Sequence, residues 1–195
     1  MIKVNKKYLS KNINVSRKLP VNIVDKDLKL FKHELKKSFP SNYVINEQNC
    51  LIFGQNIYSP KKFKLFKKET FFGYPSLKKI LKDTIKNLIS LRRVEIIKDG
   101  YWITDDKSTV YFHWFCDALQ KTAYLDLISN KKLLIPKRFI DKEFIKDSLE
   151  LLNINYQTLR PDTLYLVKSI NIIGETAPTG NYNPSTLRQL QETFH

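Results

Sequence analysis

The chain of 195 residues is 42% hydrophobic and carries 34 Lys and Arg against 19 Asp and Glu, a formal net charge of +15. This apolar content is enough to bury a core, and it excludes an intrinsically disordered chain. The scarcity of glycine, with 5 residues, argues against a loop-rich all-β sandwich, and the lack of internal repeats argues against a solenoid. A positive charge is typical of proteins with an anionic partner. Here the lysines are spread over the whole chain, which favours a purely compositional origin.

The first ninety residues are predicted to form a variable N-terminal region of helices and short strands, distinct from a second region over 91–195. Its predicted elements are, in order, an extended lead-in over 1–20, a helix over 25–39 that ends at Pro40, two short strands over 43–59 with a turn near Glu47–Asn49, and a helix after Ser76.

The region over 91–195 alternates between strand and helix patterns. Its predicted elements are a hairpin that turns at Asp99-Gly100, an apolar helix over 110–128, a short strand that ends at Pro136, an amphipathic helix over 141–154, a strand over 160–173 and a last helix from Ser185. Such alternation predicts βαβ units. The predicted fold class is therefore α/β, with a mostly parallel sheet flanked by helices.

The stretch TVYFHWFCDALQKTAYL, residues 109–125, is apolar on nearly every side except for one polar stripe. His113 and Asp117 are four residues apart and share a helix face, and Gln120, Lys121 and Tyr124 continue the same stripe. A buried helix tolerates polar side chains only where they are paired or line a cavity. Two interpretations follow. Either the histidine and the aspartate form a structural hydrogen-bonded pair, or they take part in catalysis.

The chain also contains a set of short motifs in a fixed order. They are His113, Trp114, Asp117 and Leu119 within the stretch above, a short strand ending in proline at Leu133–Pro136, a helix end at Leu149–Ile154 and an L-R-x-L core at Leu187–Leu190. This order and spacing resembles the family 61 glycosyltransferases, which include bacterial capsule-type polysaccharide enzymes and eukaryotic enzymes that add N-acetylglucosamine or xylose. In that family the first motif has the form N-Y-x-H-W-x-x-D-x-L-P-R. This sequence departs from the family pattern at Val110, at Gln120-Lys121 and at Asn153.

The resemblance implies a two-lobed fold of the GT-B kind, in which residues 91–195 are a Rossmann-like acceptor-side lobe. It implies inverting transfer of a sugar from a nucleotide-sugar donor to a polysaccharide or glycan acceptor, with no metal ion and no bound cofactor. The later segments of the family, an R-x-x-x-N-E-like and an H-G-A-x-L-like stretch, do not occur in this sequence. A C-terminal donor lobe is therefore expected to be absent, and this chain alone is expected to turn over no nucleotide sugar at a useful rate.

Inverting transfer needs one base, which takes the proton of the acceptor hydroxyl as the nucleotide leaves. Either His113 or Asp117 could be that base while the other orients it, and we prefer Asp117 as the base or acceptor anchor. Trp114, Lys121 and Tyr124 are the predicted substrate-binding residues.

Other motifs point to different chemistry. The DKD sequence at Asp25–Asp27 has the spacing of a metal-binding D-x-D motif, but acidic residues also belong at a helix start, so we expect no metal there. The run Lys61–Lys68 with its phenylalanines could stack bases or lie on a lipid surface. It supports the alternative function, a small basic protein that binds nucleic acid or another anionic polymer without catalysis.

The sequence also bears on location. Its two cysteines form no paired framework, and its first twenty residues lack the apolar core of a secretory signal. We therefore expect a cytoplasmic protein, and its basic charge would allow peripheral contact with an anionic membrane at the inner face.

Overall fold

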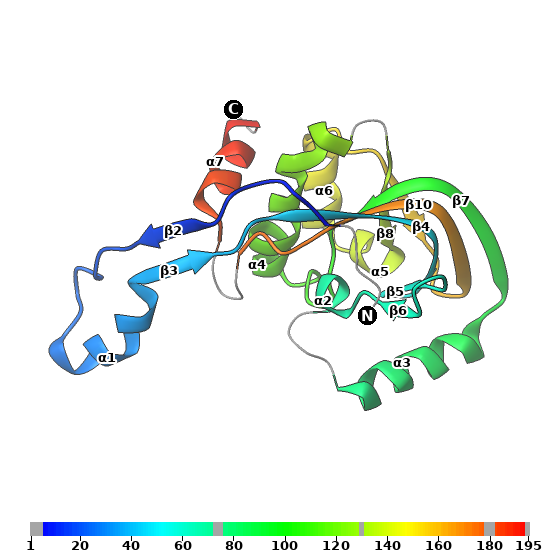
Figure 1. Ribbon diagram of the computed structural model, residues 1–195, viewed down its shortest axis with the longest axis horizontal. Coiled ribbons are helices and arrows are strands. Elements are labelled where there is room, and N and C mark those ends of the chain that lie inside the picture. The colour runs from blue at the N-terminus through cyan, green and yellow to red at the C-terminus, as the bar shows by residue number, and fades with distance from the viewer. Residues whose placement is uncertain (1–5, 72–75, 129–130, 178–181, 194–195) are drawn as a thin grey trace.

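The computed structural model describes residues 6–71, 76–128, 131–177 and 182–193. Within these residues an eight-stranded sheet forms the centre of the molecule, in the order β6-β5-β4-β10-β7-β8-β9, and β1 pairs with β4 (Figure 1). The strands are β1 (Lys6–Tyr8), β4 (Tyr43–Phe53), β5 (Asn56–Ser59), β6 (Lys64–Leu65), β7 (Arg93–Trp102), β8 (Leu133–Pro136), β9 (Tyr156–Leu159) and β10 (Thr163–Ile173).

The sheet is mixed, and β10 divides it. On one side of β10 the strands β7, β8 and β9 all run parallel, each to its neighbour. On the other side β4 is antiparallel to β10, and the pairs β1–β4, β4–β5 and β5–β6 are antiparallel as well. The predicted α/β class is therefore confirmed, with its parallel part built from the region after residue 91.

The helices from residue 77 onward follow the prediction, except for the short α5, which was not predicted. They are α3 (Leu77–Ser90), α4 (Tyr111–His113), α5 (Lys137–Ile140), α6 (Glu143–Leu151) and α7 (Pro184–Thr193). The chain continues without a break from α4 through a π-helical segment (Trp114–Ala118) into a 3-10 segment (Leu119–Ile128), and we call residues 111–128 the central helix. The predicted apolar helix is thus confirmed as helical. Its hydrogen-bonding pattern changes from α to π between His113 and Asp117. Short π-helical segments are frequent at functional sites.

The predicted hairpin at Asp99-Gly100 is wrong, because β7 passes straight through both residues. The glycine has another role. A Cβ atom at Gly100 would lie 2.5 Å from Cγ of Leu134 on β8, so the missing side chain lets the two strands pack closely. Two neighbouring strands, β10 and β8, hold β7 in extended form at this point.

Two predictions in the N-terminal region are also wrong. The segment 25–39 forms short helical turns (Asp25–Asp27, α1 at Leu28–Phe31 and Lys32–Glu34) followed by β3 (Lys36–Phe39), which pairs with β2 (Ile13–Ser16) in a separate two-stranded sheet. Leu28, Leu30 and Phe31 remain exposed, so a longer helix would bury little of their apolar surface, whereas Phe39 is buried as part of β3. The strand β4 runs through the predicted turn at Glu47–Asn49, and the chain turns instead at Gly54, where φ is 59°. A final short helix, α2, spans Lys67–Thr70.

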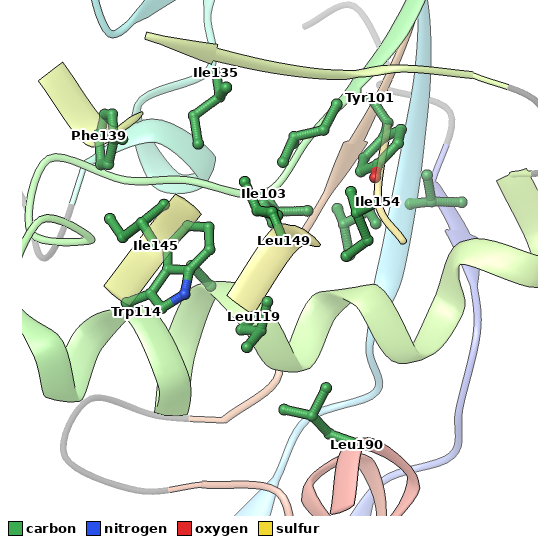
Figure 2. Close-up of a cluster of buried hydrophobic side chains, with 14 residues drawn as sticks. Tyr101, Ile103, Trp114, Leu119, Ile135, Phe139, Ile145, Leu149, Ile154 and Leu190 are labelled. Carbon is green, nitrogen blue, oxygen red and sulfur yellow. The ribbon is translucent and has the colours of Figure 1, made fainter. Parts of the chain in front are cut away.

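Side chains from alternate positions of the strands build two hydrophobic clusters. Tyr101 and Ile103 contribute to one of them and Trp102 to the other, as expected for the period of two along a strand. The first cluster lies between the sheet and the central helix, α5, α6 and α7 (Figure 2). Its fully buried side chains are Ile103, Trp114, Leu119, Leu133, Ile135, Phe139, Ile145, Leu149 and Ile173. This cluster fixes the central helix against the parallel part of the sheet.

Candidate active site

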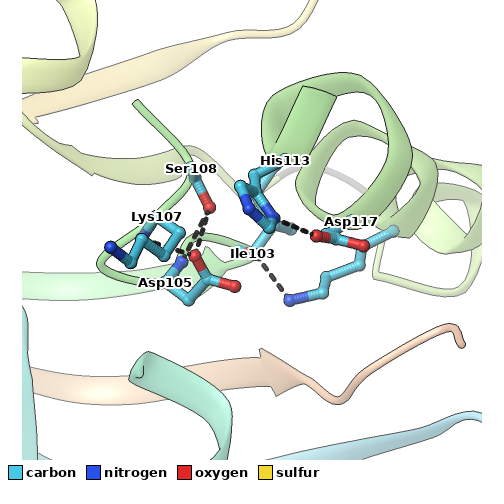
Figure 3. Close-up of polar contacts among 7 residues, drawn as sticks. Ile103, Asp105, Lys107, Ser108, His113 and Asp117 are labelled. Atoms are coloured by element: carbon cyan, nitrogen blue, oxygen red, sulfur yellow. Dashed lines mark hydrogen bonds and ion pairs between the residues drawn. The ribbon is translucent and has the colours of Figure 1, made fainter. Parts of the chain in front are cut away.

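The candidate site begins where the chain leaves β7. A compact turn follows the strand: the carboxylate of Asp105 accepts hydrogen bonds from the Lys107 backbone N–H at 2.9 Å and from the Ser108 hydroxyl at 3.0 Å (Figure 3). The Ser108 Oγ in turn accepts from the Asp105 backbone N–H at 3.0 Å. These bonds order the loop that delivers the chain into the central helix. Asp105 was not among the predicted site residues.

His113 and Asp117 form the pair that the sequence predicts. Nδ1 of His113 lies 2.6 Å from Oδ2 of Asp117, within one turn of the central helix (Figure 3). The two side chains are 19% and 15% exposed, so they are neither sealed in the core nor fully solvated. The predicted hydrogen-bonding contact is confirmed, and partial burial is the environment in which such a pair can be tuned for proton transfer.

Burial raises the pKa of the Asp117 carboxyl above its usual value of 3.8. The hydrogen bond and the charge of His113 act in the opposite direction, while the neighbouring carboxylate of Asp105 raises the pKa further. The carboxylate therefore costs free energy when it ionises in the folded chain, and its interaction with His113 offsets part of that cost.

This shift makes a prediction for Asp117→Asn. A carboxyl whose folded pKa is raised contributes stability that is fully present below its unfolded pKa and is lost as the pH rises through the raised folded pKa. Asparagine cannot ionise. The melting temperature of Asp117→Asn relative to the native chain should therefore increase as the pH is raised from acid to neutral. Thermal unfolding across that range measures it, with the exposed Asp147→Asn on α6 as the control for loss of one negative charge. A difference that stays flat or falls with pH would contradict the burial argument.

The predicted substrate-binding role of Lys121 is not supported, because the side chain is buried. Its ammonium group donates a hydrogen bond to the Ile103 backbone oxygen at 2.7 Å, which ties the central helix to the end of β7. Burial lowers the pKa of Lys121, and carboxylates act against that shift, in decreasing order Asp105, Glu175, Asp117 and Glu69. The buried amino group of Lys121 therefore lies among acidic groups beside the site.

Trp114, a predicted substrate contact, lies in the core. Its side chain is fully buried in the first cluster (Figure 2). The indole N–H donates to the Ser148 hydroxyl on α6 at 2.8 Å. Tyr124 is half-buried, and its hydroxyl is hydrogen-bonded to the side chain of Asn42, just before β4. Burial raises the pKa of this tyrosine, while its hydrogen bond with Asn42 lowers it. Trp114 therefore joins the central helix to α6, and Tyr124 joins it to the chain just before β4.

The pair lies on the helix that follows the carboxyl end of β7, and this position makes it a candidate site. Because Ile172 of β10 is level with Trp102 of β7 in a parallel pair, the carboxyl ends of these two strands lie side by side. From this point the connection after β7 leads to β8, on the opposite side from β10. In open α/β sheets ligands bind outside the carboxyl ends of the strands. Sequence spacing could not place β10 beside β7.

The basic run Lys61–Lys68 does not form an unbroken positive patch. Lys62 pairs with Glu47 at 2.5 Å, and Lys68 lies 3.7 Å from a carboxylate oxygen of Glu175. Of its aromatic side chains, Phe66 is fully buried and Phe63 is exposed. The predicted basic surface for nucleic acid is therefore partly neutralised by acidic partners from other strands and loops.

Two other kinds of feature are absent from the described part of the chain. Among those residues no three or more His, Cys, Asp or Glu side chains are grouped so as to hold a metal ion, and Asp25 and Asp27 lie in a short helical turn away from the central helix. No helix in the same residues has both the length and the apolar character to cross a bilayer. No protein-family model, no curated protein and no solved structure matches this chain.

Proposed function

We propose that this chain is the acceptor-side part of a glycosyltransferase, in which the His113–Asp117 pair takes the proton of the acceptor hydroxyl. The observation that carries the proposal is the 2.6 Å contact between Nδ1 and Oδ2 in two partly exposed side chains near the carboxyl end of β7. The resemblance of the surrounding sequence to family 61 glycosyltransferases supports the reaction type.

In the proposed reaction the acceptor oxygen attacks the anomeric carbon of the donor sugar while the bond from that carbon to the nucleotide phosphate breaks. The proton leaves the acceptor hydroxyl for the base, and the configuration at carbon inverts. If Nδ1 of His113 donates to the Asp117 carboxylate, the lone pair of the imidazole is on Nε2. The contact thus favours His113 as the base and Asp117 as the group that orients it, the reverse of the preference drawn from sequence.

The buried surroundings of the pair fit this assignment. The carboxylate of Asp117 stabilises the imidazolium that forms when His113 takes the proton, and partial exclusion of water strengthens that interaction. Of the groups that act on Asp117, Lys121 also lowers the pKa of its carboxyl. In this arrangement His113 acts as the base and Asp117 orients it. The central helix carries both residues and follows the turn at Asp105–Ser108.

Acceptor binding is the direct test, because it depends on this chain's own residues. The chain has three histidines, His33, His113 and His195. Their imidazole signals should be separate in a two-dimensional NMR spectrum, and His113→Gln would assign one of them. Titration with a panel of neutral and acidic oligosaccharides should move the His113 signals with saturation. His33, in the segment next to β3, is the internal control and should not move.

A structural pair would behave differently. If no oligosaccharide moves the His113 signals, the proposal fails. Any nucleotide release that the chain shows with a nucleotide-sugar panel should fall by about 10²–10⁴ in His113→Gln. Release that is unchanged in this variant would assign the chemistry to other residues.

A further inference from the structure

The helix α3 carries an apolar surface that the fold leaves uncovered. It is set apart from the rest of the molecule, at the point where the chain enters β7 (Figure 1). Leu81, Ile85 and Ile89 are 60%, 48% and 74% exposed, and only Ile80 among the described apolar side chains of this helix is buried. Within the described residues no strand or other helix makes more than marginal contact with α3. The helix thus shows an aliphatic surface to solvent.

The charges of α3 are arranged beside that surface. Leu81, Ile85 and Ile89 are spaced by four residues and form one row along the helix. Lys78, Lys82 and Lys86 have the same spacing and form the adjacent row, and all three lysines are exposed. An aliphatic row and a lysine row therefore run side by side along the helix. The sequence of α3 holds four lysines against one aspartate.

We propose that α3 binds the surface of an anionic membrane, with its axis in the plane of the interface. Helices that bind in this way have a strong separation of apolar and basic faces and a low average hydrophobicity, and their apolar side chains enter the boundary between headgroups and acyl chains. The lysine stems can extend along the apolar surface and bring their ammonium groups to lipid phosphates. The net charge of +15 adds a long-range attraction to the same surface.

Nucleic acid fits this helix less well. Sequence-tolerant binding of single strands relies on aromatic side chains on which bases stack, and the sequence LKKILKDTIKNLIS of α3 contains no aromatic residue. Binding of duplex phosphates would use the lysine row but would leave the aliphatic row exposed to water. A surface with both negative charge and an apolar layer satisfies both rows. This inference is independent of the proposed function, since it concerns a different part of the chain.

Vesicle flotation tests the proposal. The full chain should float with vesicles of phosphatidylcholine that contain phosphatidylglycerol as about a third of the lipid, and much less with phosphatidylcholine alone. Leu81→Glu places a negative charge in the aliphatic row and should weaken binding by about tenfold or more. Lys82→Gln should weaken it by about fivefold and should reduce its dependence on salt.

Leu151→Glu is the matched control, because Leu151 is a leucine of similar exposure (67%) on α6, a helix that packs on the core. It should bind vesicles as the native chain does, and circular dichroism checks that both variants fold. The proposal is overturned if the native chain does not bind anionic vesicles, or if Leu81→Glu binds them as well as Leu151→Glu does. It is also overturned if light scattering shows that Leu81→Glu dissociates a dimer of the native chain, since a second copy would then cover α3.

Discussion

Trp114→Ala is expected to lower the free energy of unfolding by about 3–5 kcal/mol, because it removes a fully buried indole and leaves a cavity that the surrounding core fills only in part. The side chain lies between the central helix and α6 in the cluster that joins both to the sheet. Its loss also removes the hydrogen bond to Ser148. Equilibrium unfolding in urea measures the change.

The conservative variant Trp114→Phe separates packing from hydrogen bonding. Phenylalanine keeps most of the ring volume but has no N–H, and the Ser148 hydroxyl keeps its own bond to the Ile145 carbonyl oxygen at 2.9 Å. We expect a loss of about 1–2 kcal/mol, well below that of the alanine variant. Near-native stability of Trp114→Ala would show that the indole is not in the core. The prediction that Trp114 contacts the substrate would then be favoured.

Gly100→Ala is expected to destabilise the chain by about 1–3 kcal/mol through overpacking. The added Cβ would lie 2.5–2.8 Å from three carbon atoms of the Leu134 side chain. Leu134 is fully buried, so it has no solvent to move into. Urea unfolding of the variant gives the magnitude.

A double-mutant cycle tells close packing from a turn requirement. In a Leu134→Ala background the space beside Gly100 is open, and Gly100→Ala should cost much less than it does in the native chain. A hairpin turn at Asp99-Gly100 would need the backbone freedom of glycine in both backgrounds. Equal costs in the two backgrounds would therefore support the turn and contradict the continuous strand β7.

The sequence by itself determined the elements whose signals are local. The amphipathic patterns of α3, α6 and α7 and the apolar runs of β8 and β10 predict helices and strands close to those observed. The contact of His113 with Asp117 belongs to the same class, since side chains four residues apart on a helix meet whatever surrounds them. The α/β class follows from the alternation of these elements.

The tertiary structure decided everything that depends on partners distant in the chain. Gly100 has the sequence signal of a turn, yet two neighbouring strands keep it extended and Leu134 fills the space beside it. Residues 36–39 have helical spacing, yet they pair with β2 as a strand in which Phe39 is buried.

The same limit applies to the candidate site. Trp114 and Lys121 lie on or near the polar stripe of one helix, and their spacing does not say which directions the sheet and α6 will cover. Only the packing of the central helix on β7 buries them, and only the parallel pairing of β10 with β7 brings the carboxyl ends of the two strands together. Periodicity encodes the neighbours of a residue along its own element, whereas burial and the assembly of a site are set by contacts between elements that close long loops of chain.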